Sequence, residues 1–118
     1  MQLKLSSRTV DGVAVVDCEG RIVFGEESAS LRDSVKNMLT MNKQIVLNLG
    51  GVNYIDSGGL GTLVALYSTA QKADSSVRLA ALTQRVGDLL QVTKLVTVFD
   101  VFDTVQEAVN SFRKGAAA

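Results

Sequence analysis

The sequence VNYIDSGGLG, residues 52–61, lies between the most apolar short run of the chain and its longest amphipathic pattern. The preceding run, residues 45–49, is aliphatic and β-branched, which is typical of a strand buried on both faces. The following segment repeats apolar residues at helical spacing, at Leu60, Leu63, Val64 and Tyr67. Residues 52–61 are therefore predicted to form the turn from a buried strand into a helix.

Two good helix-capping residues, Asp56 and Ser57, stand at this predicted turn. Whichever of them caps the helix, the Ser57 hydroxyl lies where backbone N–H groups lack intrahelical partners and the helix dipole is positive. A phosphate group attached there would be electrostatically favoured. Ser57 is equally explained as a simple cap and Asp56 as a turn former, and neither role excludes the other.

Glycines occupy positions 58, 59 and 61, around Leu60. They do not form a nucleotide-binding loop, because the lysine and hydroxyl residue of a P-loop are missing and the spacing differs from G-x-G-x-x-G. We expect these glycines to remove side chains from the first helical turn. The backbone N–H groups and the Ser57 hydroxyl would then be open to a docking protein.

The composition disfavours several classes of function. The 118 residues suit one domain, and 12 basic and 12 acidic residues give no net charge that would favour nucleic acid or anionic membranes. The absence of histidine excludes a Ser-His-Asp hydrolase, and the single cysteine, Cys18, cannot supply a thiolate zinc cluster. We therefore expect no catalytic site, no metal and no cofactor, and a small buried core role for Cys18.

The sequence contains no run that approaches the roughly 20 apolar residues of a membrane span. Its N-terminus also lacks the apolar core of a signal peptide. We expect a cytoplasmic protein without membrane insertion.

The remaining patterns predict the order of elements. Strands at residues 3–9 and 13–18 flank Asp11-Gly12, a dipeptide that favours a tight hairpin turn. A helix with apolar positions at Leu31, Val35, Met38 and Leu39 follows. Further strands are expected at 77–82 and 95–99, with helices capped by Thr83 and by Asp103 or Thr104.

This order predicts a single α/β domain over residues 1–114, with residues 115–118 as a disordered tail. The expected sheet is mixed, with an N-terminal antiparallel pair followed by parallel strands, and about four helices cover it.

The run Ile55-Asp56-Ser57-Gly58-Gly59-Leu60-Gly61, with its flanking strand and helix, resembles the phosphorylation loop of STAS domains, the family of bacterial anti-sigma factor antagonists. The order of elements matches that family over nearly the whole chain. In the family, a partner kinase phosphorylates the first serine after the aspartate. The resemblance therefore implies Ser57 as the phosphorylation site.

The resemblance also implies a non-enzymatic module that regulates transcription. Unphosphorylated, it would bind an anti-sigma factor serine kinase and so release a sigma factor, and a serine phosphatase would reset it. The ATP and magnesium would belong to the kinase. The expected partner surface comprises Phe24, Asp56, Ser57, Gly58, Gly59 and the exposed side of the following helix, namely Thr62, Ser68, Thr69 and Lys72. The alternative in this family is a constitutive scaffold subunit of a stressosome-like or lipid-transport complex.

Two positions depart from the family pattern. Many members carry a second hydroxyl residue directly after the phosphorylated serine, where this chain has Gly58. Members also commonly carry an acidic residue in the loop after the second strand, where Val23 or Phe24 stands here, and Glu26 or Glu27 is the candidate substitute. Phe24 is expected either to be an exposed apolar anchor for a partner or to pack against the first helix.

Overall fold

The structure is a computed structural model that describes the backbone of residues 3–117 and the side chains of residues 3–112. Its elements are β1 (Leu3–Val10), β2 (Val13–Ile22), α1 (Glu26–Leu39), β3 (Gln44–Ile55), α2 (Ser57–Lys72), β4 (Ser76–Ala80), α3 (Gln84–Val92), the 3-10 helix η1 (Leu95–Thr97), β5 (Val101–Phe102) and α4 (Val105–Ala117). The expected tail at residues 115–118 lies outside the residues whose side chains are described.

The five strands form one sheet in the order β1-β2-β3-β4-β5. β1 pairs antiparallel with β2, and the three other pairings are parallel. The turn between β1 and β2 is made by Asp11 and Gly12, whose φ angles are 51° and 83°. Such positive φ angles are what an Asp-Gly hairpin turn requires. The predicted α/β domain with a mixed sheet and an N-terminal antiparallel pair is confirmed.

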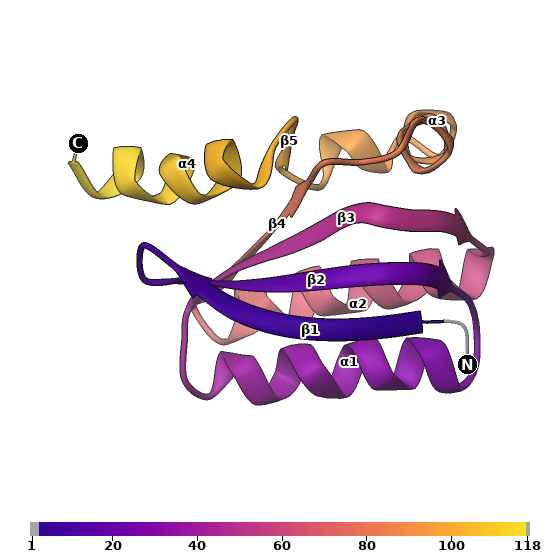
Figure 1. The fold of residues 1–118 in the computed structure, drawn as a ribbon, viewed down its shortest axis with the longest axis horizontal. Helices are drawn as coiled ribbons and strands as arrows, with labels where there is room; N and C mark the ends of the chain where they lie inside the picture. The colour runs from indigo at the N-terminus through magenta and orange to yellow at the C-terminus, as the bar shows by residue number, and fades with distance from the viewer. Residues whose placement is uncertain (1–2, 118) are drawn as a thin grey trace.

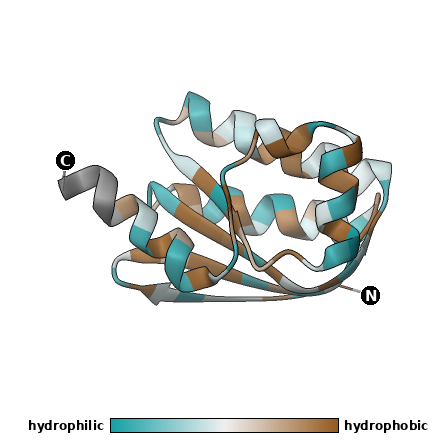
Figure 2. Cartoon of the chain, turned by 90° about the horizontal axis from the view of Figure 1, so that it is seen from above, coloured by the Kyte–Doolittle hydropathy of each residue, from teal (hydrophilic) through white to brown (hydrophobic). Residues whose placement is uncertain are grey.

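The helices bury two faces of the sheet. The larger apolar cluster contains residues of α1, α2 and α3, such as Leu31, Leu63 and Leu90. The smaller cluster lies under α4 and contains Phe112. Figure 1 shows α1 and α2 together on one side of the strands and α4 on the other. In Figure 2 apolar and polar segments alternate along the helices, as in helices with one buried face.

The central strand is buried on both faces, as its sequence predicts. Val46 points into the smaller cluster and its neighbour Leu47 into the larger one, and both are fully buried. The strand is longer than the predicted residues 45–49, because it continues through Gly50 and Gly51 with shifts of register against β2. Such irregularities let a strand continue past residues that break regular pairing.

The predicted strand at residues 95–99 is wrong. Residues 95–97 form η1, and the edge strand β5 follows at Val101–Phe102. Lys94 adopts the left-handed conformation, with φ 67°, which ends α3 and starts the tight 3-10 turn. Phe99 then turns into the core, with 4% of its surface exposed, while Val96 and Val98 face outward. The β-branched residues of this run favour a strand, but the left-handed conformation of Lys94 and the burial of Phe99 go with a tight turn instead.

At one edge of the sheet, two strands end and two helices begin. β2 and β3 finish side by side, with Ile22 opposite Ile55. Because α1 follows β2 and α2 follows β3, the N-terminal ends of both helices lie at this same edge (Figure 1). The candidate site is located there.

Candidate functional site

Asp56 is the residue that caps α2. Its backbone is extended, and its Oδ1 accepts a hydrogen bond of 2.7 Å from the Gly59 N–H. Ser57 is then the first residue inside the helix, and its side chain is exposed. The choice that the sequence left open between two capping residues is thus resolved, and the cap leaves the Ser57 hydroxyl outside the capping hydrogen bond.

Asp56 also fixes the loop between β2 and α1. The Phe24 N–H donates to both carboxylate oxygens, at 3.1 and 3.2 Å, across 32 positions of sequence. The pKa of Asp56 is lowered, chiefly because the Gly59 N–H donates to the carboxylate, with smaller contributions from the N–H groups of Phe24 and Gly58, while partial desolvation opposes the shift. The carboxylate is therefore charged at neutral pH, and it joins the start of α2 to the Phe24 loop.

Gly58 and Gly59 allow α2 to approach the end of β2 closely. A Cβ atom on Gly58 would lie 2.5 Å from the Cβ of Phe24, and one on Gly59 would overlap the backbone carbonyl of Ile22. A Cβ on Gly61 would meet nothing within 4 Å. Gly58 and the buried Gly59 therefore have a packing role that the sequence did not predict, and the expectation that the glycines open the first turn to a docking protein stays a prediction.

The same contact explains the missing hydroxyl residue after Ser57. Any side chain at position 58 would begin with a Cβ atom that overlaps Phe24. Phe24 and Gly58 are thus matched to each other, which the sequence does not reveal because 34 positions separate them.

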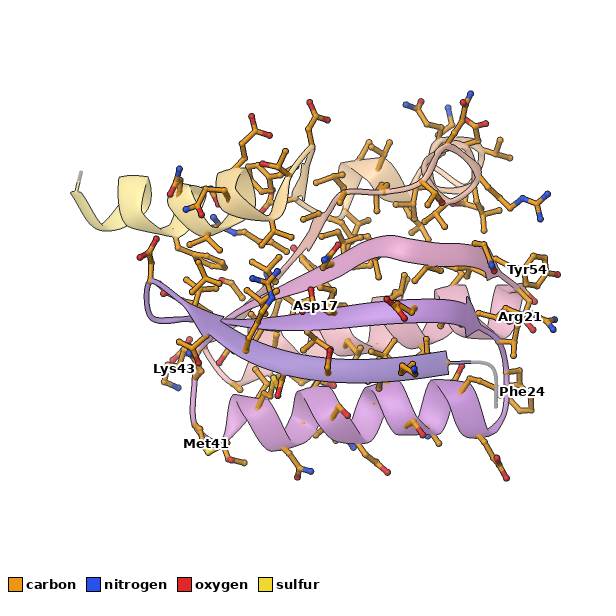
Figure 3. The ribbon with its side chains drawn as sticks, viewed as in Figure 1. Asp17, Arg21, Phe24, Met41, Lys43 and Tyr54 are labelled. Atoms are coloured by element: carbon orange, nitrogen blue, oxygen red, sulfur yellow. The ribbon has the colours of Figure 1, made fainter. Side chains whose placement is uncertain are left out.

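Phe24 is exposed, with 80% of its surface open to solvent, so the first of the two expected placements is the one observed. Arg21 and Tyr54 lie at the same edge, where the Arg21 guanidinium carbon is 5.3 Å from the centre of the Tyr54 ring. Figure 3 shows all three side chains pointing outward there. The sequence analysis missed Arg21 and Tyr54, which only the register of β2 against β3 brings together.

A groove of about 370 Å³ lies between the N-terminal halves of α1 and α2. Its lining includes Phe24, Arg32 of α1 and the small residues Gly61 and Ala65 of α2. The groove gives a partner protein a recess beside the exposed Phe24 ring.

Thr62 does not lie on the exposed side of α2, contrary to expectation. Only 6% of its surface is exposed, and its hydroxyl donates to the Gly58 carbonyl at 3.1 Å. Position 62 is one turn after Gly58, on the flank of α2 that faces inward. Ser68 is exposed, whereas Thr69 is half-buried.

Lys72 is exposed but lies in the last turn of α2. Because a helix rises by about 1.5 Å per residue, Lys72 is roughly 22 Å along the axis from Ser57. The structure therefore brings Phe24, Asp56, Ser57 and Gly58 together at one edge and leaves Lys72 at the opposite end of the helix.

The acidic residues Glu26 and Glu27 lie in the first turn of α1. The pKa of Glu27 is lowered, first by its own backbone N–H, with Arg21 contributing a smaller charge effect. Whether either residue replaces the acidic side chain of the family loop stays a prediction.

The described residues offer no cluster of three or more histidine, cysteine, aspartate or glutamate side chains placed to hold a metal ion. Cys18 is buried, and burial raises the pKa of its thiol to about 12, so the thiolate is scarce at neutral pH. Within residues 3–117, none of the helices is both long and apolar enough to cross a bilayer.

Comparison with known proteins places the whole arrangement in a family. The model of the STAS domain matches residues 4–108. The chain belongs to the STAS domain family. BtrV of Bordetella bronchiseptica, named as a candidate anti-sigma factor antagonist, is 19% identical to this STAS domain over 111 residues, which cover 94% of this chain and 96% of BtrV.

Solved structures share the fold of this STAS domain. An anti-sigma factor antagonist from Mycobacterium paratuberculosis superposes with a TM-score of 0.81 at 23% identity, over 94% of each chain. Unphosphorylated SpoIIAA of Bacillus, also an anti-sigma factor antagonist, gives 0.77 at 16% identity, over 94% of this chain and 97% of SpoIIAA. SpoIIAA has also been solved in a phosphorylated form, which gives a TM-score of 0.69 at 14% identity, over 93% of this chain and 98% of SpoIIAA.

Proposed function

We propose that this STAS domain is a phosphorylation-switched binding module, which binds an anti-sigma factor serine kinase while Ser57 is unphosphorylated and so releases a sigma factor. The observation that carries the proposal is the exposed Ser57 side chain at the first position of α2, beside the exposed Phe24 ring. Asp56 accepts the capping hydrogen bond from the Gly59 N–H, so the Ser57 hydroxyl is not needed for the cap. The names of the relatives support the same class of partner.

The switch is a phosphoryl transfer from ATP, bound with magnesium on the kinase, to Ser57. A bond forms between Ser57 Oγ and the γ-phosphorus, the bond from that phosphorus to the β–γ bridging oxygen breaks, and ADP leaves. The hydroxyl proton passes to a base of the kinase, since this chain has no histidine to accept it. A serine phosphatase would hydrolyse the phosphoserine and restore the hydroxyl.

The phosphate would oppose docking by its charge and its volume. It adds about 1.5 to 2 negative charges next to the Asp56 carboxylate, at the centre of the proposed partner surface. A kinase surface that fits the Ser57 hydroxyl would have to desolvate this charge without a partner for it, which weakens binding.

The test uses the cognate kinase with the wild-type chain, Ser57→Ala and Ser57→Asp. Incubation with ATP and magnesium should add one phosphate to the wild type and none to Ser57→Ala, as read by mass spectrometry. Calorimetry should show Ser57→Ala binding the kinase like the wild type and Ser57→Asp binding at least about tenfold more weakly, a loss of about 1.4 kcal/mol.

The matched control is Asn110→Asp, which adds the same charge at an exposed residue of α4, on the other side of the sheet from α2. It should bind the kinase like the wild type. Phosphate found on a residue other than Ser57 would contradict the proposal. Equal binding by Ser57→Asp and the wild type would instead favour a constitutive scaffold subunit.

A further inference from the structure

The Phe24 loop is held by few contacts. Ser28 donates to the Val23 carbonyl and the Ala29 N–H donates to the Gly25 carbonyl, whereas the Phe24 residue itself is held by its N–H on the Asp56 carboxylate. The ring itself is open to solvent, so apolar burial does little to fix it. The position of Phe24 therefore depends on the carboxylate of a residue adjacent to Ser57.

The Asp56 carboxylate shares its donors with any anion placed on Ser57. Its Oδ1 takes the Gly59 N–H, at 2.7 Å, which is one of the first-turn donors that also stabilise a phosphate at a helix start. A phosphate on the next residue adds a like charge within the same turn and competes for these donors. Both effects displace the carboxylate from its present position.

From this geometry we infer that Asp56 is a positioning residue that couples Ser57 to Phe24. Phosphate on Ser57 weakens the hydrogen bond that the Phe24 N–H donates to Asp56, and Phe24 is then released from its place against Gly58. The inference rests on the proposed function and adds a second effect of the phosphate. The phosphate both occupies the contact at Ser57 and removes the ordered apolar anchor beside it.

Release of Phe24 would change the groove beside it, where a partner is expected to bind. Phe24 and Gly58 both line the groove between α1 and α2. A displaced Phe24 no longer lines the groove in the same way, so a kinase side chain that fits it loses a contact. A partner must then order the loop again on binding, which lowers its affinity.

The test measures the loop in the full-length chain without any kinase. Phosphoserine is installed at position 57 during synthesis, and amide hydrogen exchange of the Phe24 N–H is followed by NMR in the modified and unmodified chains. Phosphoserine should accelerate exchange at Phe24 about fivefold or more, the factor expected for one lost hydrogen bond. Added negative charge by itself slows base-catalysed exchange, so acceleration reports the lost bond.

Two controls separate coupling from general loosening. The Val86 N–H is held by the Thr83 hydroxyl in the equivalent cap of α3, and its exchange should stay within about twofold. In an Asp56→Asn background, which lacks the charge, phosphoserine should change the Phe24 exchange rate far less than it does with Asp56 present. This interaction between the two changes is the readout that a merely structural aspartate would not give.

Equal exchange at Phe24 with and without phosphoserine would overturn the inference, as would an equal effect of phosphoserine in the Asp56→Asn background. Because the phosphoserine is installed without a kinase, this outcome is independent of whether a kinase modifies Ser57. A failure of the coupling and a failure of the proposed function are therefore separate results.

Discussion

At the scale of single residues, two carboxylates join separate elements of this STAS domain. Asp56 joins a helix start to a loop, and Asp17 joins neighbouring strands. The Arg8 Nε donates to Asp17 Oδ2 at 2.8 Å, and the Asn48 side-chain amide donates to Oδ1 at 2.7 Å. These bonds lower the pKa of Asp17, with the Arg8 hydrogen bond as the largest cause and burial opposing it.

The lowered pKa of Asp17 predicts acid sensitivity. The stabilisation is complete above the unfolded-state pKa of about 3.9 and is lost as the pH falls through the lower pKa of the folded state, so the free energy of unfolding should decline below about pH 4. Asp17→Asn should remove this part of the decline and cost about 0.5 to 1 kcal/mol at neutral pH, the range for a solvent-screened pair. Urea unfolding at a series of pH values measures both effects.

Asp33→Asn, on the exposed surface of α1, is the control and should keep the acid-dependent decline. An unchanged pH profile in Asp17→Asn would show that the Arg8 pair does not contribute to the acid dependence.

Residue-level features were predictable from sequence where they depend on near neighbours. Thr83 caps α3 by accepting the Val86 N–H, as expected, and Thr104 accepts the Glu107 N–H at the start of α4. The choice between Asp56 and Ser57 was not predictable, because both residue types cap helices equally well and the Phe24 N–H that favours Asp56 comes from a distant strand end.

At the scale of elements, α2 depends on glycines for two different reasons. Gly59→Ala should destabilise the chain by about 1 to 3 kcal/mol or more, because its methyl group would overlap the Ile22 backbone, which has no flexible side chain to move aside. Gly61→Ala is the matched control in the same helical turn. Its methyl group meets open space, and alanine should stabilise the helix by up to about 1 kcal/mol. Thermal unfolding of both variants measures the difference.

Equal effects of the two alanines would contradict this assignment, since helix propensity alone treats both positions alike. Sequence reasoning had given all the glycines one role, because a sequence shows the missing side chain and not the backbone that approaches it.

The elements that the sequence predicted well have regular periodicity. The buried stripe of α1 at Leu31 and Val35 lies where expected. The strand predicted at residues 95–99 was wrong because the apolar residues there suit a strand and a tight turn equally well. Only the burial of Phe99 in the core decides between the two.

At the scale of the whole molecule, the two apolar clusters share β3 and should unfold together. Leu47→Ala in the larger cluster should cost about 2 to 5 kcal/mol, and Phe112→Ala in the smaller one about 3 to 5 kcal/mol. Each variant should show one transition that far-UV circular dichroism and tyrosine fluorescence report at the same urea concentration. Val92→Ala, at a side chain with 79% exposure, should change stability by less than about 0.5 kcal/mol.

An early, separate transition in Phe112→Ala would mean that α4 folds as an independent unit, against this expectation. The shared strand makes that outcome unexpected, because Val46 and Leu47 cannot keep their places independently of each other.

The reach of Asp56 across 32 positions of sequence also bears on protein synthesis. While the ribosome has released β2 but not β3, the Phe24 loop has no carboxylate to hold it and Gly58 is not yet present beneath the ring. A nascent chain therefore cannot form the partner surface around Phe24 and Ser57 before β3 and the start of α2 have been made. A kinase that binds this surface would not bind incomplete chains.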